Sequence, residues 1–193
     1  MKPEPSPTTD EDCADLIVHL ARLAHSGPGA AQLSAAQWTA LRYFARANRF
    51  SRTPSAFSEF HATTRGTASQ TVKSLVSMGF LERRSNEADG RSALIEVTDA
   101  GHAMLAQDPL ADLRRALAEQ PAEVRAALMK HLRAATETLA EQRSARTFGR
   151  CDECSHCAPR DTGAYCHCTQ AMLRAEEMGA LCIDFTPKLR SAG

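Results

Sequence analysis

The chain has 193 residues, 43% of them hydrophobic and 24% charged, which is typical of one globular domain with room for a small additional module. This balance excludes a wholly disordered chain, a collagen-like repeat and a coiled-coil fibre. No apolar run approaches the roughly 18 residues of a membrane-spanning helix, and the acidic, proline-rich start lacks the pattern of a secretory signal. We therefore expect a cytoplasmic protein with no membrane partner.

Charge and cysteine are both distributed unevenly, although 23 basic and 23 acidic residues give a net charge of zero. Residues 40–91 carry nine basic and four acidic residues, a net charge of +5, whereas residues 1–39 have a net charge of −3. Six of the seven cysteines lie between Cys151 and Cys182, and Cys13 is the exception. The sequence thus predicts two separate sites, a basic one in the middle and a cysteine-rich one near the C-terminus.

The chain is predicted to begin with a flexible arm, followed by two helices. Residues 1–11 contain three prolines and no apolar periodicity, so we expect the arm there. Apolar residues at helical spacing predict a first helix, capped by Asp10 or Asp12, that ends before the Gly-Pro-Gly sequence at 27–29. Ser34 caps a second helix, in SAAQWTALRYFARAN, whose inward face is expected to carry Trp38, Leu41, Phe44 and Ala45.

The following segment predicts a helix-turn-helix and a β-hairpin. Thr53-Pro54 opens a short third helix, and TRGTASQTVKSLVSMGF predicts a fourth that ends at Gly79. Two helices of this length joined by a tight turn are a helix-turn-helix candidate. Residues 80–84 and 93–97 have the composition of strands, and the charged loop between them predicts a hairpin. A helix capped by Thr98 follows, broken or kinked at Pro109, and the last long helix starts at Pro121.

The fourth helix carries side chains that can read DNA. A helix in the major groove needs small and polar residues on its exposed face. The candidates are Thr64, Arg65, Thr67, Ser69, Gln70 and Lys73. On the hairpin, Arg83, Arg84 and Arg91 would contact phosphates or a narrow minor groove. Arginines can also form a plain solvated face, but their clustering in one block favours double-stranded DNA as the partner.

This order of elements resembles the MarR family of winged helix-turn-helix transcription regulators over about residues 12–145. The segments that carry the resemblance are LSAAQWTALRYFARAN, RGTASQTVKSLVSMGFLERR and DGRSALIEVTDAG. The chain departs from the family pattern at Asp89-Gly90-Arg91, where the wing has one arginine fewer. The resemblance implies a mainly α (α+β) winged helix-turn-helix fold, and a homodimer held by its N- and C-terminal helices on a pseudo-palindromic operator. It also implies a regulator and not an enzyme.

The cysteines form the pattern Cys151-x2-Cys154-x2-Cys157-x8-Cys166-x-Cys168-x13-Cys182. Six thiols in a chain expected to be cytoplasmic favour metal or redox chemistry over a disulfide framework. We favour an iron–sulfur cluster of the 4Fe–4S or 2Fe–2S type, and a zinc ion or a metal-free thiol switch remain open. The pattern is similar to cysteine-rich tails of some winged-helix regulators. That similarity implies Cys151, Cys154, Cys166 and Cys182 as ligands, with Cys157 and Cys168 as alternates.

These observations predict three parts. Residues 1–11 form a flexible arm, 12–149 a DNA-binding and dimerisation domain, and 150–193 a cysteine-rich module with one short helix in AMLRAEEMG. The predicted function is a homodimeric repressor controlled by a cluster that senses redox state, oxygen, nitric oxide or iron–sulfur supply. The alternative is a winged-helix regulator with a structural zinc site or a thiol switch. A redox or electron-transfer enzyme would leave the helix-turn-helix unexplained.

Overall fold

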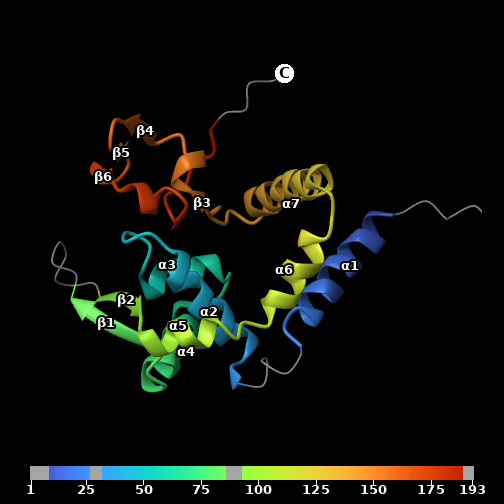
Figure 1. Ribbon diagram of the computed structural model, residues 1–193, viewed down its shortest axis with the longest axis horizontal. Helices are drawn as coiled ribbons and strands as arrows, with labels where there is room; N and C mark the ends of the chain where they lie inside the picture. The colour runs from blue at the N-terminus through green and yellow to red at the C-terminus, as the bar shows by residue number, and fades with distance from the viewer. Residues whose placement is uncertain (1–8, 27–31, 86–92, 189–193) are drawn as a thin grey trace, which may run out of the picture.

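The protein is described by a computed structural model that covers residues 9–26, 32–85 and 93–188. The helices are α1 (Asp10–Leu23), α2 (Ala35–Arg46), α3 (Pro54–Phe60), α4 (Arg65–Ser77), α5 (Asp99–Leu105), α6 (Leu110–Ala118) and α7 (Ala122–Gln142). The strands are β1 (Leu81–Ser85), β2 (Ala93–Val97), β3 (Gly149–Arg150), β4 (Cys157–Arg160), β5 (Gly163–Cys166), β6 (Ala171–Leu173) and β7 (Leu181–Cys182). In Figure 1 the wing lies at the lower left and strands β4, β5 and β6 of the C-terminal module lie at the upper left.

Local capping signals explain most helix starts. The hydroxyl group of Ser34 accepts a hydrogen bond from the backbone N–H of Gln37, and Thr53, Thr64 and Thr98 cap their helices in the same way. The cap predicted for α1 was wrong. Thr9 fills that position because its hydroxyl accepts from the N–H of Asp12, whose carboxylate accepts in return from Thr9.

The core of the winged-helix lobe lies between α2, α3, α4 and the wing. Trp38, Leu41 and Phe44 are buried as predicted, whereas Ala45 is exposed and Tyr43 takes a place in the core instead. The Tyr43 hydroxyl donates to the carbonyl oxygen of Ser51 over 2.7 Å, which satisfies it inside the core. With its hydroxyl group satisfied, the Tyr43 ring contributes its large apolar surface to the core.

The predicted hairpin is confirmed as the antiparallel pair β1–β2, with Leu81 opposite Val97 and Ser85 opposite Ala93. Leu81 and Ile95 point into the core, while Arg83 and Arg84 are exposed. The wing tip, including Arg91, lies outside the described residues. The predicted break at Pro109 is also confirmed, since α5 ends before it and α6 begins directly after it.

Helices α1, α6 and α7 contain no buried residue in the part of the chain that the structure describes. Their exposed apolar side chains are Leu16, Ile17, Val18, Leu20 and Leu23 on α1, and Val124, Leu128, Met129, Leu132 and Leu139 on α7. These helices extend away from the winged-helix lobe (Figure 1). None of the described helices is both long and apolar enough to span a membrane.

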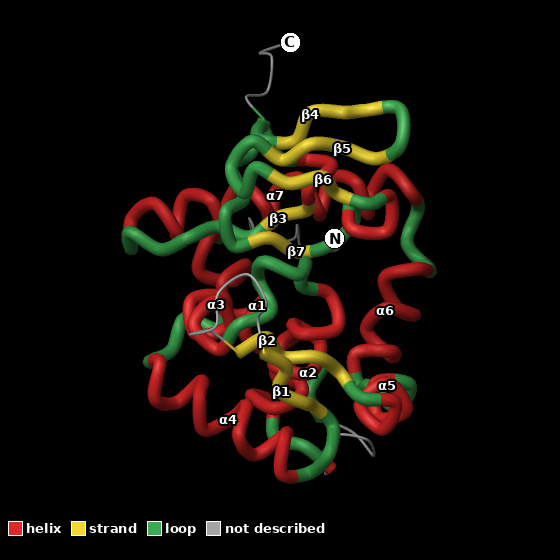
Figure 2. Tube along the Cα trace, turned by 90° about the vertical axis from the view of Figure 1, so that its left-hand side faces the viewer, coloured by secondary structure: helices red, strands yellow, loops and turns green. Residues whose placement is uncertain are grey.

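The C-terminal module consists of two small sheets that lie above the winged-helix lobe in Figure 2 and contact the segment that follows α2. Strands β3 and β7 pair with each other, and β4, β5 and β6 form an antiparallel sheet in that order. The helix predicted in AMLRAEEMG was wrong. Its first three residues pair as β6 with β5, which buries Leu173, and Ala175–Glu177 forms a single 3-10 turn. In so short a segment, pairing with a neighbouring strand decides the structure, even where the apolar residues are spaced as in a helix.

Candidate functional sites

The exposed face of α4 is made of the residues predicted to contact DNA. Thr64, Arg65, Thr67, Gln70 and Lys73 are exposed and Ser69 is half-buried, while Ala68, Val72 and Leu75 fix the opposite face in the core. The Thr64 hydroxyl is already engaged, because it accepts from the N–H of Thr67 over 3.1 Å and lies 2.9 Å from the Thr67 hydroxyl. Thr64 therefore orients the start of α4, and the longer side chains that follow remain free to approach bases.

The two described wing arginines differ in their surroundings. Arg83 is exposed and forms no ion pair within the described residues. Arg84 lies 2.7 Å from a carboxylate oxygen of Glu82 and 2.9 Å from one of Glu96. Hydrogen bonding to Glu82, with the nearby charge of Glu96, raises the pKa of the Arg84 guanidinium above its ordinary value. A phosphate would have to compete with these carboxylates for Arg84, whereas no carboxylate in the described part of the wing pairs with Arg83.

Five cysteines converge on one site in the C-terminal module. Cys151, Cys154, Cys157, Cys166 and Cys182 are all at least 91% buried and line a common small cavity. Cys157 lies directly opposite Cys166 in the β4–β5 pair, so strand register brings these two together. The four cysteines predicted as ligands and the alternate Cys157 thus share one site. The other alternate, Cys168, is exposed and does not line it.

Hydrogen-bond donors surround these sulfur atoms. The Asn48 side-chain amide donates to Cys151 Sγ over 3.8 Å, and the backbone N–H of Thr186 donates to Cys154 Sγ over 3.5 Å. The hydroxyl group of Thr169 is buried, has no hydrogen-bond partner among the described residues and borders the cavity. Donors of this kind stabilise sulfur that carries negative charge.

The thiols of Cys151 and Cys182 form a coupled pair. The Cys151 S–H donates to Cys182, which lowers the pKa of Cys182 to about 6 and, together with burial, raises the pKa of Cys151. Burial also raises the pKa of Cys157. Of these thiols, Cys182 is the one whose surroundings favour the thiolate, the form that binds metal.

The chemistry of this donor set fits a group held by four thiolates. Besides the five cysteines, the cavity is lined by Asn48, Thr169, Asp184 and the apolar residues Phe50 and Leu173, and no histidine or basic residue lines it among the described residues. The cavity holds only about 10 Å³, and no three Cys, His, Asp or Glu side chains in the described ranges are arranged as metal ligands. The buried cysteines therefore match zinc and iron–sulfur sites in the type of ligand and in burial, two features that both kinds of site share.

The residues missed by the sequence analysis are Asn48, Thr169 and Thr186. Asn48 belongs to the winged-helix part of the chain, 103 residues from Cys151, so no spacing rule connects the two. The two threonines lie within the cysteine-rich segment, but threonine is common in loops and gives no signal of its own. The chain path in three dimensions is what brings these donors to the sulfur atoms.

The fold and the exposed polar helix define a winged helix-turn-helix protein of the kind that binds DNA. Residues 31–92 match the model of the MarR family, whose members are transcriptional regulators and not enzymes. This match covers the segment from the turn before α2 through the wing. It confirms the predicted resemblance for that segment.

Solved structures with the same fold extend the likeness to about seven tenths of the chain. A MarR transcriptional regulator from Methanosarcina mazei Go1 is 18% identical with a TM-score of 0.55, covering 68% of this chain and 99% of its own. The PcaV transcriptional regulator of Streptomyces coelicolor, solved with its natural ligand, is 18% identical with a TM-score of 0.54, covering 71% and 98%. MepR of S. aureus, in complex with DNA, is 18% identical with a TM-score of 0.54, covering 70% and 99%. None of the curated proteins matches the chain in sequence.

Proposed function

We propose that the protein is a homodimeric transcriptional repressor whose affinity for operator DNA is controlled by an iron–sulfur cluster in the C-terminal module. The observation that carries the proposal is the cluster of five buried thiols beside the helix-turn-helix. Five buried free thiols that line one cavity supply the ligand type by which iron–sulfur clusters are held. Redox state, oxygen, nitric oxide and iron–sulfur supply are the signals that such a group would report.

Support for DNA binding comes from α4 and the wing. Arg65, Gln70 and Lys73 are exposed on the helix that a winged helix-turn-helix protein inserts into the major groove. Gln70 can pair with adenine and Arg65 with guanine, while Arg83 supplies a phosphate contact from the wing. The likeness to MepR, which was solved on DNA, agrees with this assignment.

Support for a homodimer comes from the unburied helices. Large apolar side chains of α1 and α7 are exposed in the described part of the chain, and Leu16 and Leu23 are more than half exposed. Rows of exposed leucine and valine on helices are expected to pack against another surface. A second copy would bury them and would place two copies of α4 on a pseudo-palindromic operator.

A structural zinc ion is the second candidate, and the composition of the module's core favours it. Besides the five cysteines, only Ala164 and Leu173 are buried in this core among the described residues. So small an apolar core is commonly stabilised by a metal or other cross-link. Zinc would then hold the module together without making the regulator sensitive to redox state.

Anaerobic purification followed by a visible spectrum and by iron, sulfide and zinc analysis decides between the two. Iron and sulfide with charge-transfer absorption are expected. Stoichiometric zinc in a colourless protein would overturn the cluster. Cys166→Ser should abolish iron binding, and the matched control Cys168→Ser should retain it because Cys168 is exposed outside the cavity.

The proposed control of DNA binding by the cluster is tested separately. The cluster-loaded protein is first used to select a duplex from a random DNA library. The affinities of the loaded and the iron-free protein for that duplex are then compared at fixed salt. We expect a pseudo-palindromic sequence and a difference in affinity. Equal affinities would overturn control by the cluster, and the absence of any enriched sequence would overturn operator recognition.

A further inference from the structure

The segment between α2 and α3 touches both the cysteine site and the wing. Residues 47–52 follow the end of α2 and lead into Thr53, the cap of α3. This segment is therefore part of the chain that positions the helix-turn-helix. Its contacts run in two directions, one toward the C-terminal module and one toward β2.

Toward the C-terminal module, the contacts are hydrogen bonds to the residues on either side of Cys182. The N–H of Asn48 donates to the carbonyl oxygen of Leu181 over 2.8 Å, and the N–H of Ile183 donates to the Ser51 hydroxyl over 2.9 Å. Asn48 is 2% exposed and Ser51 is fully buried. Bonds so shielded from water hold the two parts of the protein in a fixed relation.

Toward the wing, the segment is bonded to β2. The carbonyl oxygen of Arg52 accepts a hydrogen bond from the N–H of Ile95 over 2.8 Å. Ile95 is buried in the core beneath the wing, opposite Arg83 in the β1–β2 register. A displacement of residues 47–52 would therefore reach both the start of α3 and β2, the strand that pairs with the arginine-bearing β1.

The Asn48 side chain joins these contacts to a sulfur atom. Its Nδ2 donates to Cys151 Sγ over 3.8 Å, and its Oδ1 accepts from the N–H of Ser51 over 2.9 Å. The carboxamide group is planar, so its donor and acceptor move together. A change at Cys151 is thereby carried by one rigid group to the backbone of Ser51.

We propose that Asn48 is the positioning residue that couples the state of Cys151 to the arrangement of α3 and the wing. The inference rests on the proposed function, since it requires a site that is either loaded or empty. A neutral thiol is a weak acceptor, whereas a ligating thiolate carries charge and accepts a stronger hydrogen bond. The Asn48 bond is thus stronger in the loaded protein, which favours one position of residues 47–52.

A second contact between the same parts of the protein serves as a control. Arg49 lies 2.7 Å from a carboxylate oxygen of Glu177 and donates to the carbonyl oxygen of Met172 over 2.7 Å. These bonds also tie the segment to the C-terminal module, but they do not involve a cysteine sulfur. Arg49→Gln therefore weakens the attachment of the module without touching the bond to Cys151.

The first test measures the ratio of DNA affinities for loaded and iron-free protein with the selected duplex at fixed salt. Wild type and Arg49→Gln should keep the same ratio, expected within the range of about 5–150-fold typical of coupled sites. Asn48→Asp keeps the acceptor for Ser51 but replaces the donor with oxygen, and its ratio should fall toward one while iron content is retained. An unchanged ratio in Asn48→Asp would overturn the role of Asn48.

A second test needs no variant. Amide hydrogen exchange of wild type should be slower at Asn48, Ser51 and Ile95 in the loaded protein than in the iron-free protein. Equal exchange at these three amides would overturn the inference even if Asn48→Asp fails to fold or to retain iron. Equal DNA affinity of loaded and iron-free wild type would instead overturn the proposed function, so the two failures are distinguishable.

Discussion

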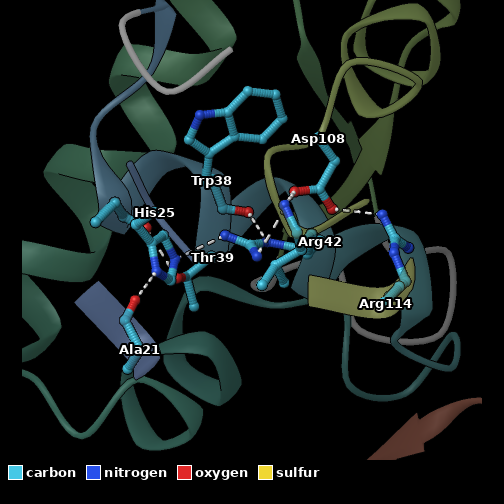
Figure 3. Close-up of polar contacts among 9 residues, drawn as sticks. Ala21, His25, Trp38, Thr39, Arg42, Asp108 and Arg114 are labelled. Atoms are coloured by element: carbon cyan, nitrogen blue, oxygen red, sulfur yellow. Dashed lines mark hydrogen bonds and ion pairs between the residues drawn. The ribbon is translucent and has the colours of Figure 1, made fainter. Parts of the chain in front are cut away.

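The guanidinium group of Arg42 lies between the imidazole of His25 and the buried carboxylate of Asp108 (Figure 3). Arg42 Nη2 is 2.9 Å from His25 Nε2, and Nη1 is 3.7 Å from Asp108 Oδ1. Asp108 also accepts from Arg114 on α6 over 3.1 Å. This network joins the end of α1, the middle of α2 and the start of α6, where the winged-helix lobe meets the helices expected to form the dimer.

Asp108→Asn should destabilise the protein by about 3 kcal/mol, because it leaves a mostly buried guanidinium without its counter-charge. The Asp108 side chain is only 3% exposed. Burial lowers the pKa of Arg42, and the charge of Asp108 opposes that shift. Urea unfolding measures the loss. Asp112→Asn is the matched control, since its pair with Arg115 is solvent-exposed and should contribute less than about 1 kcal/mol; equal losses would contradict the prediction.

The His25 ring should donate a hydrogen bond from Nδ1 and accept one at Nε2. Nδ1 lies 2.8 Å from the carbonyl oxygen of Ala21, which can only accept, and Nε2 faces the donor Arg42. Ring ¹⁵N chemical shifts at neutral pH report the tautomer. Arg42→Gln removes the fixed donor and should mix the two tautomers, whereas a proton on Nε2 in wild type would show that the contact with Arg42 does not form.

Arg83→Ala and Arg84→Ala should differ in their effect on DNA binding. No carboxylate pairs with Arg83 among the described residues, so its loss should reduce the slope of log affinity against log salt by about 1. Arg84 is held by Glu82 and Glu96, so its loss should change the slope less. Fluorescence anisotropy titrations between low and moderate salt measure both slopes. Equal reductions would mean that DNA displaces the two glutamates from Arg84.

Gly101→Ala and Gly66→Ala should shift stability in opposite directions. A β-carbon at Gly101 would overlap the carbonyl oxygen of Phe80, so the start of α5 would have to move away from the wing, at a cost of about 1–3 kcal/mol. At Gly66, in α4, the nearest atom to a β-carbon is the Thr64 hydroxyl oxygen at 3.8 Å, and alanine should stabilise the helix by about 0.5 kcal/mol. Thermal unfolding of both variants checks the signs.

Leu181→Ala should destabilise the winged-helix lobe, although Leu181 belongs to the C-terminal module. Its side chain is 9% exposed and packs in the same core as Trp38 and Phe44. The expected loss is about 2–3 kcal/mol by urea unfolding. Met172→Ala, at an exposed position of the same module, should change stability by less than about 0.5 kcal/mol. A negligible loss for Leu181→Ala would show that the module is not part of the lobe's core.

Sequence alone predicted the helix-turn-helix and the wing because their signals are local. Ser34, Thr53 and Thr64 each cap a helix through a hydrogen bond to a residue three positions further on. Proline breaks or kinks a helix because it lacks a backbone N–H, so Pro109 is also a local signal. The apolar spacing of α2 and α4 likewise depends on the helix period and not on distant parts of the chain. The boundaries of α2, α3, α4 and the β1–β2 hairpin therefore follow from neighbouring residues, whereas strands β3 to β7 of the C-terminal module were not predicted.

The tertiary structure decided the cysteine site, because convergence of side chains depends on strand register and on packing between distant segments. Cys166 and Cys168 are two residues apart, yet one lies in the site and the other is exposed, since β5 ends at Cys166 and the chain turns. Cys157 joins the site through its pairing with Cys166. Asn48 reaches Cys151 only because the C-terminal module folds back onto the turn between α2 and α3, and no local signal encodes that contact.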